Sequence, residues 1–304
     1  MESLLINELA PLTAAEVQKR NHLENIIKIL AKEIGHRNIT FYKNYLRASD
    51  FIETSLVDLG LKPKRQSFDA IGLTCYNIEV EIIGNKNQDE VLVIGAHYDS
   101  AINSPGANDN ATGIAALLTL AENFHKSNPS TTIRFVAFAN EEAPFFRTEY
   151  MGSAVYAKSC KEKNENITGM ICLETIGFYS NKAGSQRYPF PIGFMYPSTG
   201  NFIGFVSDLS SRSLLKKTIG LFRKHTNFPA ESGALPSFIP GIGWSDQWAF
   251  WQQGYPAIMV TDTAPFRYPY YHTVKDTIDK IDYDNLTHVI VGLEKVVNEM
   301  INQK

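Results

Sequence analysis

Histidine and acidic residues directly follow three short apolar runs in the sequence. These residues are His97, Asp99, Glu141, Glu142 and Glu174. The runs, residues 91–96, 132–139 and 168–173, have the length and apolar content of strands that are covered on both faces. Because ligands collect at the carboxyl ends of strands in an open α/β sheet, we expect these side chains to lie close together. Several carboxylates at one edge would repel one another unless cations neutralise them, and zinc binds both imidazole nitrogen and carboxylate oxygen.

Asp109 lies between the first two of these runs, in the segment GANDNATG just before an expected helix. Taken alone, an Asp at this place is typical of a helix N-cap. A single histidine after a strand is usually structural, and two glutamates at the start of a helix usually complement its dipole. The combination of all these residues, in this order along the sequence, nevertheless favours a metal site.

The elements that would position these residues alternate between strands and helices from residue 90 onward. The expected strands are 91–96, 132–139, 168–173, 193–196 and 257–261, and the expected helices are 112–125, 150–160, 202–223, one from 246, and 283–301. This alternation predicts an α/β fold with three layers, in which a central, mostly parallel mixed sheet lies between helices.

Before residue 90, the apolar spacing predicts two helices within residues 14–60, followed by strands at 64–68 and 75–83. We expect residues 1–304 to form a single domain, with the helical pair of residues 1–62 packed on it. Residues 180–192 and 226–245 are rich in Gly, Pro, Ser and aromatic residues, and we expect them to form long ordered loops over a site.

The composition excludes several classes of function. The 304 residues carry a net charge of -3, and their basic residues are scattered, which argues against nucleic-acid binding. The longest apolar runs are too short to cross a membrane. The N-terminus shows no secretory signal, and the three cysteines form no CxxC pair, so we expect a cytoplasmic protein, or a secreted or periplasmic one if a signal has been trimmed. The oligomeric state stays open.

Seven short motifs occur in order along the chain. They are GAHYDS, GANDNATG, FANEE, MGS, LETIG, SDQWAFW and YYHT. Together they resemble the zinc aminopeptidases of the aminopeptidase S and aminopeptidase Y type, whose relatives include the glutamate carboxypeptidase II type and the glutaminyl cyclases. The resemblance covers roughly residues 75 to 302, and it implies the phosphorylase/hydrolase-like fold of the zinc exopeptidases.

Carried over by position, the resemblance implies two zinc ions bridged by Asp109. It places one zinc on His97 and Glu174, and the other on Glu142 and His272.

The same resemblance implies roles for three further side chains. Glu141 would be the general base for a zinc-bound water that hydrolyses N-terminal residues from peptides. Asp99 would orient His97 by accepting its second N–H, and Tyr271 would stabilise the developing oxyanion. Ser245 and Asp246 match a supporting loop in some relatives.

Three alternatives remain at this point. Most aminopeptidases of this type carry Asp where this chain has Glu174, whereas related dizinc carboxypeptidases and deacylases use Glu. A glutaminyl cyclase shares the fold and works with one zinc. A non-catalytic binding domain of this fold would have lost metal ligands, but all five ligand positions here carry residues that can bind zinc.

Overall fold

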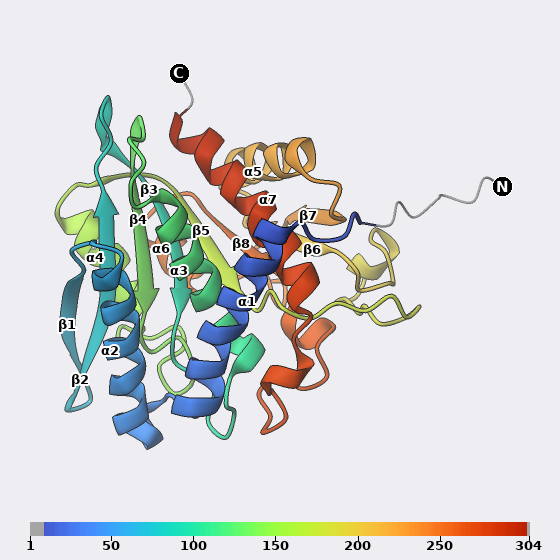
Figure 1. Cartoon of the computed structure of the whole chain (residues 1–304), viewed down its shortest axis with the longest axis horizontal. Coiled ribbons are helices and arrows are strands. Elements are labelled where there is room, and N and C mark those ends of the chain that lie inside the picture. The colour runs from blue at the N-terminus through green and yellow to red at the C-terminus, as the bar shows by residue number, and fades with distance from the viewer. Residues whose placement is uncertain (1–8, 303–304) are drawn as a thin grey trace.

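An eight-stranded sheet forms the centre of the computed structural model, which describes residues 9–302 (Figure 1). The strands are β1 (Lys64–Ala70), β2 (Leu73–Ile82), β3 (Asn87–His97), β4 (Thr131–Phe138), β5 (Asn166–Glu174), β6 (Ile203–Ser207), β7 (Ala230–Ala234) and β8 (Ala257–Thr261). Their order across the sheet is β1-β2-β4-β3-β5-β8-β6-β7. The pairs β4–β3, β3–β5, β5–β8 and β6–β7 are parallel, and the other three are antiparallel. The mixed, mostly parallel sheet confirms the predicted fold class.

Helices cover both faces of this sheet and complete the three layers. They are α1 (Ala14–Lys28), α2 (Tyr42–Asp58), α3 (Thr112–Phe124), α4 (Gly152–Glu162), α5 (Arg212–His225), α6 (Gln247–Gln252) and α7 (Tyr283–Asn302). The larger apolar core lies between the sheet and α1, α2, α3, α5 and α7. A smaller core lies under α4 and α6 on the other face. No helix within residues 9–302 is long and apolar enough to cross a membrane.

The first helix shows how local sequence sets these elements. Thr13 and Glu16 form a capping box at its start, because the Thr13 hydroxyl accepts the Glu16 N–H and the Glu16 carboxylate accepts the Thr13 N–H. Its apolar face is buried, and the helix continues through a π-helical turn, Ile29–Ile34. The chain then leaves the helix at Gly35, whose φ of 80° is readily reached only by glycine.

Two predictions between residues 190 and 245 were wrong. Residues 193–196 form no strand, because a 3-10 turn occupies Ile192–Phe194. The expected helix at 202–223 starts only at Arg212, and its first residues form β6. A short apolar run does not distinguish a buried strand from a helix, and here pairing with β8 decides for the strand. The strand β7, which lies within the expected loop 226–245, lacks strand-forming residues and forms by pairing with β6.

Candidate metal centre

The parallel strands β3, β4 and β5 deliver the predicted residues to one edge of the sheet. His97 is the last residue of β3 and Glu174 is the last residue of β5, its neighbour in the sheet. Glu141 and Glu142 follow β4. Asp109 lies in the segment Ala107–Ala111 that leads into α3, at a kink where its own backbone is not helical (φ -111°, ψ 90°). Chain direction within the sheet therefore explains why these side chains meet.

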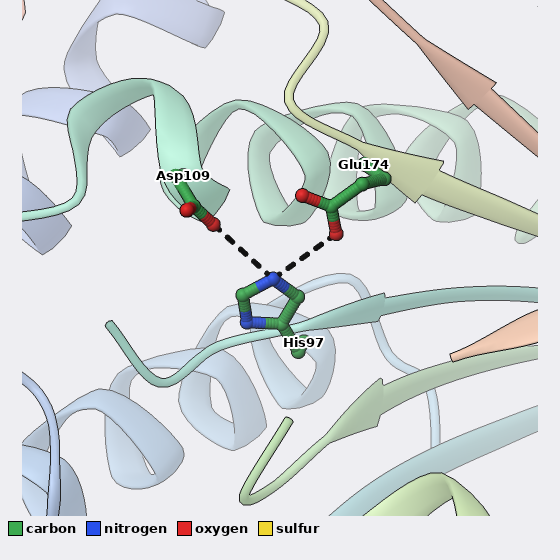
Figure 2. Close-up of side chains that lie close together, drawn as sticks. All are labelled: His97, Asp109 and Glu174. Atoms are coloured by element: carbon green, nitrogen blue, oxygen red, sulfur yellow. Dashed lines mark hydrogen bonds and ion pairs between the residues drawn. The ribbon is translucent and has the colours of Figure 1, made fainter. Parts of the chain in front are cut away.

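The first cluster of ligand atoms consists of His97, Asp109 and Glu174 (Figure 2). The Nε2 atom of His97 lies 3.1 Å from Glu174 Oε2 and 3.4 Å from Asp109 Oδ1. All three side chains are buried. Their ligand atoms all lie within 4.8 Å of one another, a spacing that fits a single cation held between them.

The second cluster consists of Asp109, Glu142 and His272. The Nε2 atom of His272 lies 3.0 Å from Asp109 Oδ2 and 3.3 Å from Glu142 Oε2. His272 comes from the loop after β8 and remains partly exposed. The two oxygens of Asp109 therefore face different histidines, so this carboxylate is placed to bridge two cations.

Unpartnered carboxylate oxygens show that the donor set fits a metal. Asp109 Oδ2 and Glu142 Oε1 are buried, yet neither accepts a hydrogen bond from any described residue. A buried carboxylate oxygen without a donor is costly unless a cation compensates it. Imidazole nitrogens combined with carboxylate oxygens are the ligands that zinc takes in catalytic sites.

Glu141 lies beside both clusters. Its side chain is buried, and its Oε2 lies 3.9 Å from His97 Nε2. Burial raises the pKa of Glu141 well above its usual value, the charge of His97 opposes the rise, and the carboxylates of Glu142 and Glu174 add to it. A higher pKa makes the ionised carboxylate a stronger base, and such a base beside bound substrate can accept and return a proton.

Asp99 contacts His97 less directly than the sequence predicted. Its Oδ1 lies 3.4 Å from His97 Nδ1, and Nδ1 has no hydrogen-bond partner among the described residues. The same carboxylate accepts the backbone N–H groups of Glu141 at 3.1 Å and of Glu142 at 3.0 Å. Asp99 thus positions the backbone that carries two other site residues.

Comparison with known proteins identifies the family. The model of "Peptidase family M28" matches residues 77–297. The chain belongs to peptidase family M28. It is 35% identical over 291 residues to the uncharacterized protein YfbL of Escherichia coli (strain K12), and this match covers 93% of the chain and 88% of that protein.

Other relatives of this M28 peptidase have names that describe an activity. It is 26% identical to a probable leucine aminopeptidase 1 of Trichophyton verrucosum (strain HKI 0517), a match that covers 67% of the chain and 53% of that relative's length. Among solved structures, the zinc aminopeptidase BSAP from Bacillus subtilis superposes with a TM-score of 0.76 at 16% identity and covers 93% and 95% of the two chains. A glutaminyl cyclase from Bacteroides thetaiotaomicron superposes with a TM-score of 0.70 at 18% sequence identity. This match covers 97% of the chain and 100% of the cyclase chain. These structural likenesses describe the shared fold.

Tyr271 borders the candidate metal ligands of the M28 peptidase. Its ring stacks on that of His272, with ring centroids 3.8 Å apart, and it lines the same pocket as Glu174. Burial raises the pKa of Tyr271 well above its usual value, and the charges of Asp109 and Glu142 contribute, so its hydroxyl keeps its proton as a donor.

Two buried residues with no role expected from the sequence support the candidate metal ligands. Asp276 follows His272 by four residues and accepts the backbone N–H groups of Asn108 and Asp109. Arg37 donates hydrogen bonds to five backbone carbonyls around the site. Nothing local to Asp276 or Arg37 distinguishes either of them from an exposed residue of its type.

Ser245, in the loop that the resemblance marked as supporting, does contact a ligand. Its hydroxyl donates a hydrogen bond to Glu174 Oε2 at 2.7 Å. Asp246 is fully buried beside it, and burial raises the pKa of Asp246 to about 7 against the opposing charge of His97.

A large apolar pocket opens next to the metal ligands. It encloses about 830 Å³ of empty space, part of it open to solvent, and reaches from Glu174 and Tyr271 to β7. Trp244 and Phe266 line it, and their rings stack with centroids 6.4 Å apart. The pocket therefore adjoins the candidate metal ligands directly, and its lining is largely apolar.

Proposed function

We propose that this M28 metallopeptidase is an aminopeptidase that binds two zinc ions and removes N-terminal residues from peptides. The observation that carries the proposal is the pair of ligand clusters that share Asp109. Each cluster offers one imidazole and two carboxylates, and a shared carboxylate suits a pair of ions.

His97 and Glu174 would hold one zinc and Glu142 and His272 the other, with Asp109 between them. When bound, such ions polarise the scissile carbonyl and make a water molecule acidic enough to attack it near neutral pH. The chain's own residues supply the remaining steps.

Glu141 moves the proton in this proposal. Its buried carboxylate takes a proton from the attacking water and returns it to the departing amine. The hydroxyl of Tyr271, held beside His272 by ring stacking, donates a hydrogen bond to the oxygen that becomes negative. Asp99 keeps Glu141 in place through its backbone N–H.

The pocket supports cleavage at the N-terminus over the C-terminus. A carboxypeptidase needs a cation for the terminal carboxylate of its substrate, and arginine commonly fills that role. The described residues that line the pocket include no Lys, Arg or His, but they include Glu174 and Glu231. These described lining residues suit an uncharged side chain and offer no cation for a terminal carboxylate.

The test combines zinc counting with a substrate panel. The purified protein is loaded with zinc and offered aminoacyl peptides, the same peptides with a blocked N-terminus, dipeptides with a C-terminal reporter, and peptides beginning with glutamine. We expect two zinc ions per chain and release of residues from free N-termini alone, with the activity lost in chelator. Cyclisation of the glutamine peptide with one zinc, or cleavage of blocked peptides only, would overturn the proposal.

A further inference from the structure

The floor of the apolar pocket is one face of the sheet, and a row of paired residues leads across it from the metal ligands. Glu174 pairs with Thr261, Thr261 with Gly204, and Gly204 with Glu231. Paired residues project to the same face, and all four line the pocket. Four strands separated by about 4.8 Å give this row a length of about 14 Å.

A second row lies directly beside the first. Met259 pairs with Val206, and Val206 pairs with Gly233. These three residues also line the pocket. The alternate residues of the same strands, such as Phe205 and Val260, point into the main core on the opposite face. Every side chain in these two rows therefore determines how deep the pocket is.

The two glycines leave the floor open at its centre and at its far end. A Cβ atom at Gly204 would lie 3.2 Å from the backbone oxygen of Thr261, and one at Gly233 would lie 3.0 Å from the hydroxyl oxygen of Tyr196. Both positions therefore face other lining residues, and any side chain there would take up space in the pocket.

Aromatic and aliphatic side chains from three loops line the rest of the pocket. Tyr188 and Tyr196 stack on each other with ring centroids 5.6 Å apart, and Ile192 lies between them in sequence. Glu231 brings a charge to the far end, but its Oε2 lies 4.0 Å from Nη2 of Arg223. The space that remains is therefore long and largely uncharged.

We propose that Gly204 and Gly233 make this enzyme selective for large apolar side chains, aromatic ones above all, at the N-terminal residue of its substrate. The proposal rests on the aminopeptidase function proposed above. A small side chain such as that of alanine would leave most of the space unfilled. An aromatic ring would bury more apolar area and would meet other rings edge-on or stacked.

The experiment compares kcat/KM for the p-nitroanilides of alanine, leucine, phenylalanine, tryptophan and lysine. The variants are Gly233→Val, the milder Gly233→Ala, and Gly204→Ala. Because β7 is an edge strand, Gly233 is the position at which a side chain disturbs the fold least. Gly220→Ala is the control, since Gly220 is exposed on α5 with open space around its Cβ position.

We expect kcat/KM of the unmodified enzyme to be at least about tenfold higher for phenylalanine and tryptophan than for alanine. Even one additional methylene group in an apolar pocket changes kcat/KM by about that factor. Gly233→Val should abolish this preference by lowering kcat/KM for phenylalanine and tryptophan, and both alanine variants should weaken it. Gly220→Ala should leave it unchanged. A preference for lysine or alanine, or unaltered selectivity in all three pocket variants, would overturn the proposal while leaving the aminopeptidase function intact.

A binding measurement separates this proposal from the aminopeptidase function. L-phenylalaninamide and L-alaninamide are titrated calorimetrically into the zinc-loaded Glu141→Gln protein, with and without Gly233→Val. If no aminoacyl substrate is cleaved, the proposed function fails. The pocket proposal then stands if the phenylalanine amide binds more tightly and Gly233→Val removes the difference, and it falls if the two amides bind alike.

Discussion

Asp276 holds Asp109 in place through the backbone: its Oδ2 accepts the Asp109 N–H at 3.1 Å. Its Oδ1 accepts the N–H of Asn108 at 2.8 Å and the hydroxyl of Tyr268 at 2.7 Å. Because Asp276 also belongs to the loop that carries His272, it joins two members of the second ligand cluster.

Replacing Asp276 with Asn should therefore weaken metal binding. The amide keeps the size of the side chain, but its NH₂ group would face at least one N–H or O–H donor that the carboxylate now accepts. We expect the affinity for zinc to fall by about 10- to 100-fold, the usual effect of losing a group that positions ligands. Competition with a coloured chelator measures it.

The control for Asp276→Asn is Asp279→Asn in the same loop. The Asp279 side chain is exposed and contacts only Thr277 and Lys280 among the described residues, so the affinity for zinc should not change. Equal affinities for zinc in the two variants, with both proteins folded by circular dichroism, would show that Asp276 does not support the site.

Replacing Glu141 with Gln should abolish turnover and leave the zinc content largely intact. Glu141 belongs to neither ligand cluster, and its carboxylate is the proposed proton carrier. General-base catalysis accounts for about 10²- to 10⁴-fold in rate, so kcat should fall by at least that amount. Exposed Glu149, in the same loop, gives the control Glu149→Gln. Near-normal kcat in Glu141→Gln would remove Glu141 from the mechanism.

Zinc affinity at the second cluster should rise with pH. Burial alone would lower the pKa of His272, but the close carboxylates of Asp109 and Glu142 and their charges raise it to about 10 in the metal-free protein. Burial and the charge of Asp109 raise the pKa of Glu142 to about 7. Zinc must displace both protons, so acid competes with binding below each pKa.

Calorimetry in buffers with different ionisation enthalpies counts these protons. We expect a net release that falls as pH rises from about 6 to about 9, because Glu142 has lost its proton at the upper end while His272 has kept it. An affinity that stays constant over this range would show that these two residues do not bind the ion.

Arg37 should contribute strongly to the stability of the fold. Its guanidinium is fully buried and donates to the carbonyls of Leu30, Gly35, Tyr98, Pro105 and Gly106. It thus joins the end of the first helical segment to the chain just after His97 and just before Asp109.

In Arg37→Met the carbonyls around Arg37 would lose their donors, and we expect the free energy of unfolding to fall by on the order of 3 kcal/mol or more. The Tm should then decrease by about 2–4 °C per kcal/mol in calorimetry. Arg47→Met, on the exposed face of α2, should change the Tm little. A Tm for Arg37→Met within error of the unmodified protein would contradict the assigned role.

The sequence by itself determined the elements whose signals are local. The capping pair Thr13 and Glu16 and the terminator Gly35 specify the first helix. The apolar run that became β8 was predicted with its observed bounds, Ala257–Thr261. His97, Glu142 and Glu174 stood at or just after strand ends, so chain direction predicted that they would gather at one edge of the sheet.

Only the tertiary structure decided which distant groups support and shape the site. The strand β7 exists because β6 pairs with it, and its residues 230–234 carry no strand signal of their own. The roles of Arg37 and Asp276 depend on carbonyls and N–H groups from other segments, and local sequence does not say which segments pack together. The pocket floor at Gly204 and Gly233 likewise arises from the register between strands. The two-residue periodicity of a strand indicates on which face of the sheet a side chain lies, but it does not specify which residues of other strands lie beside it.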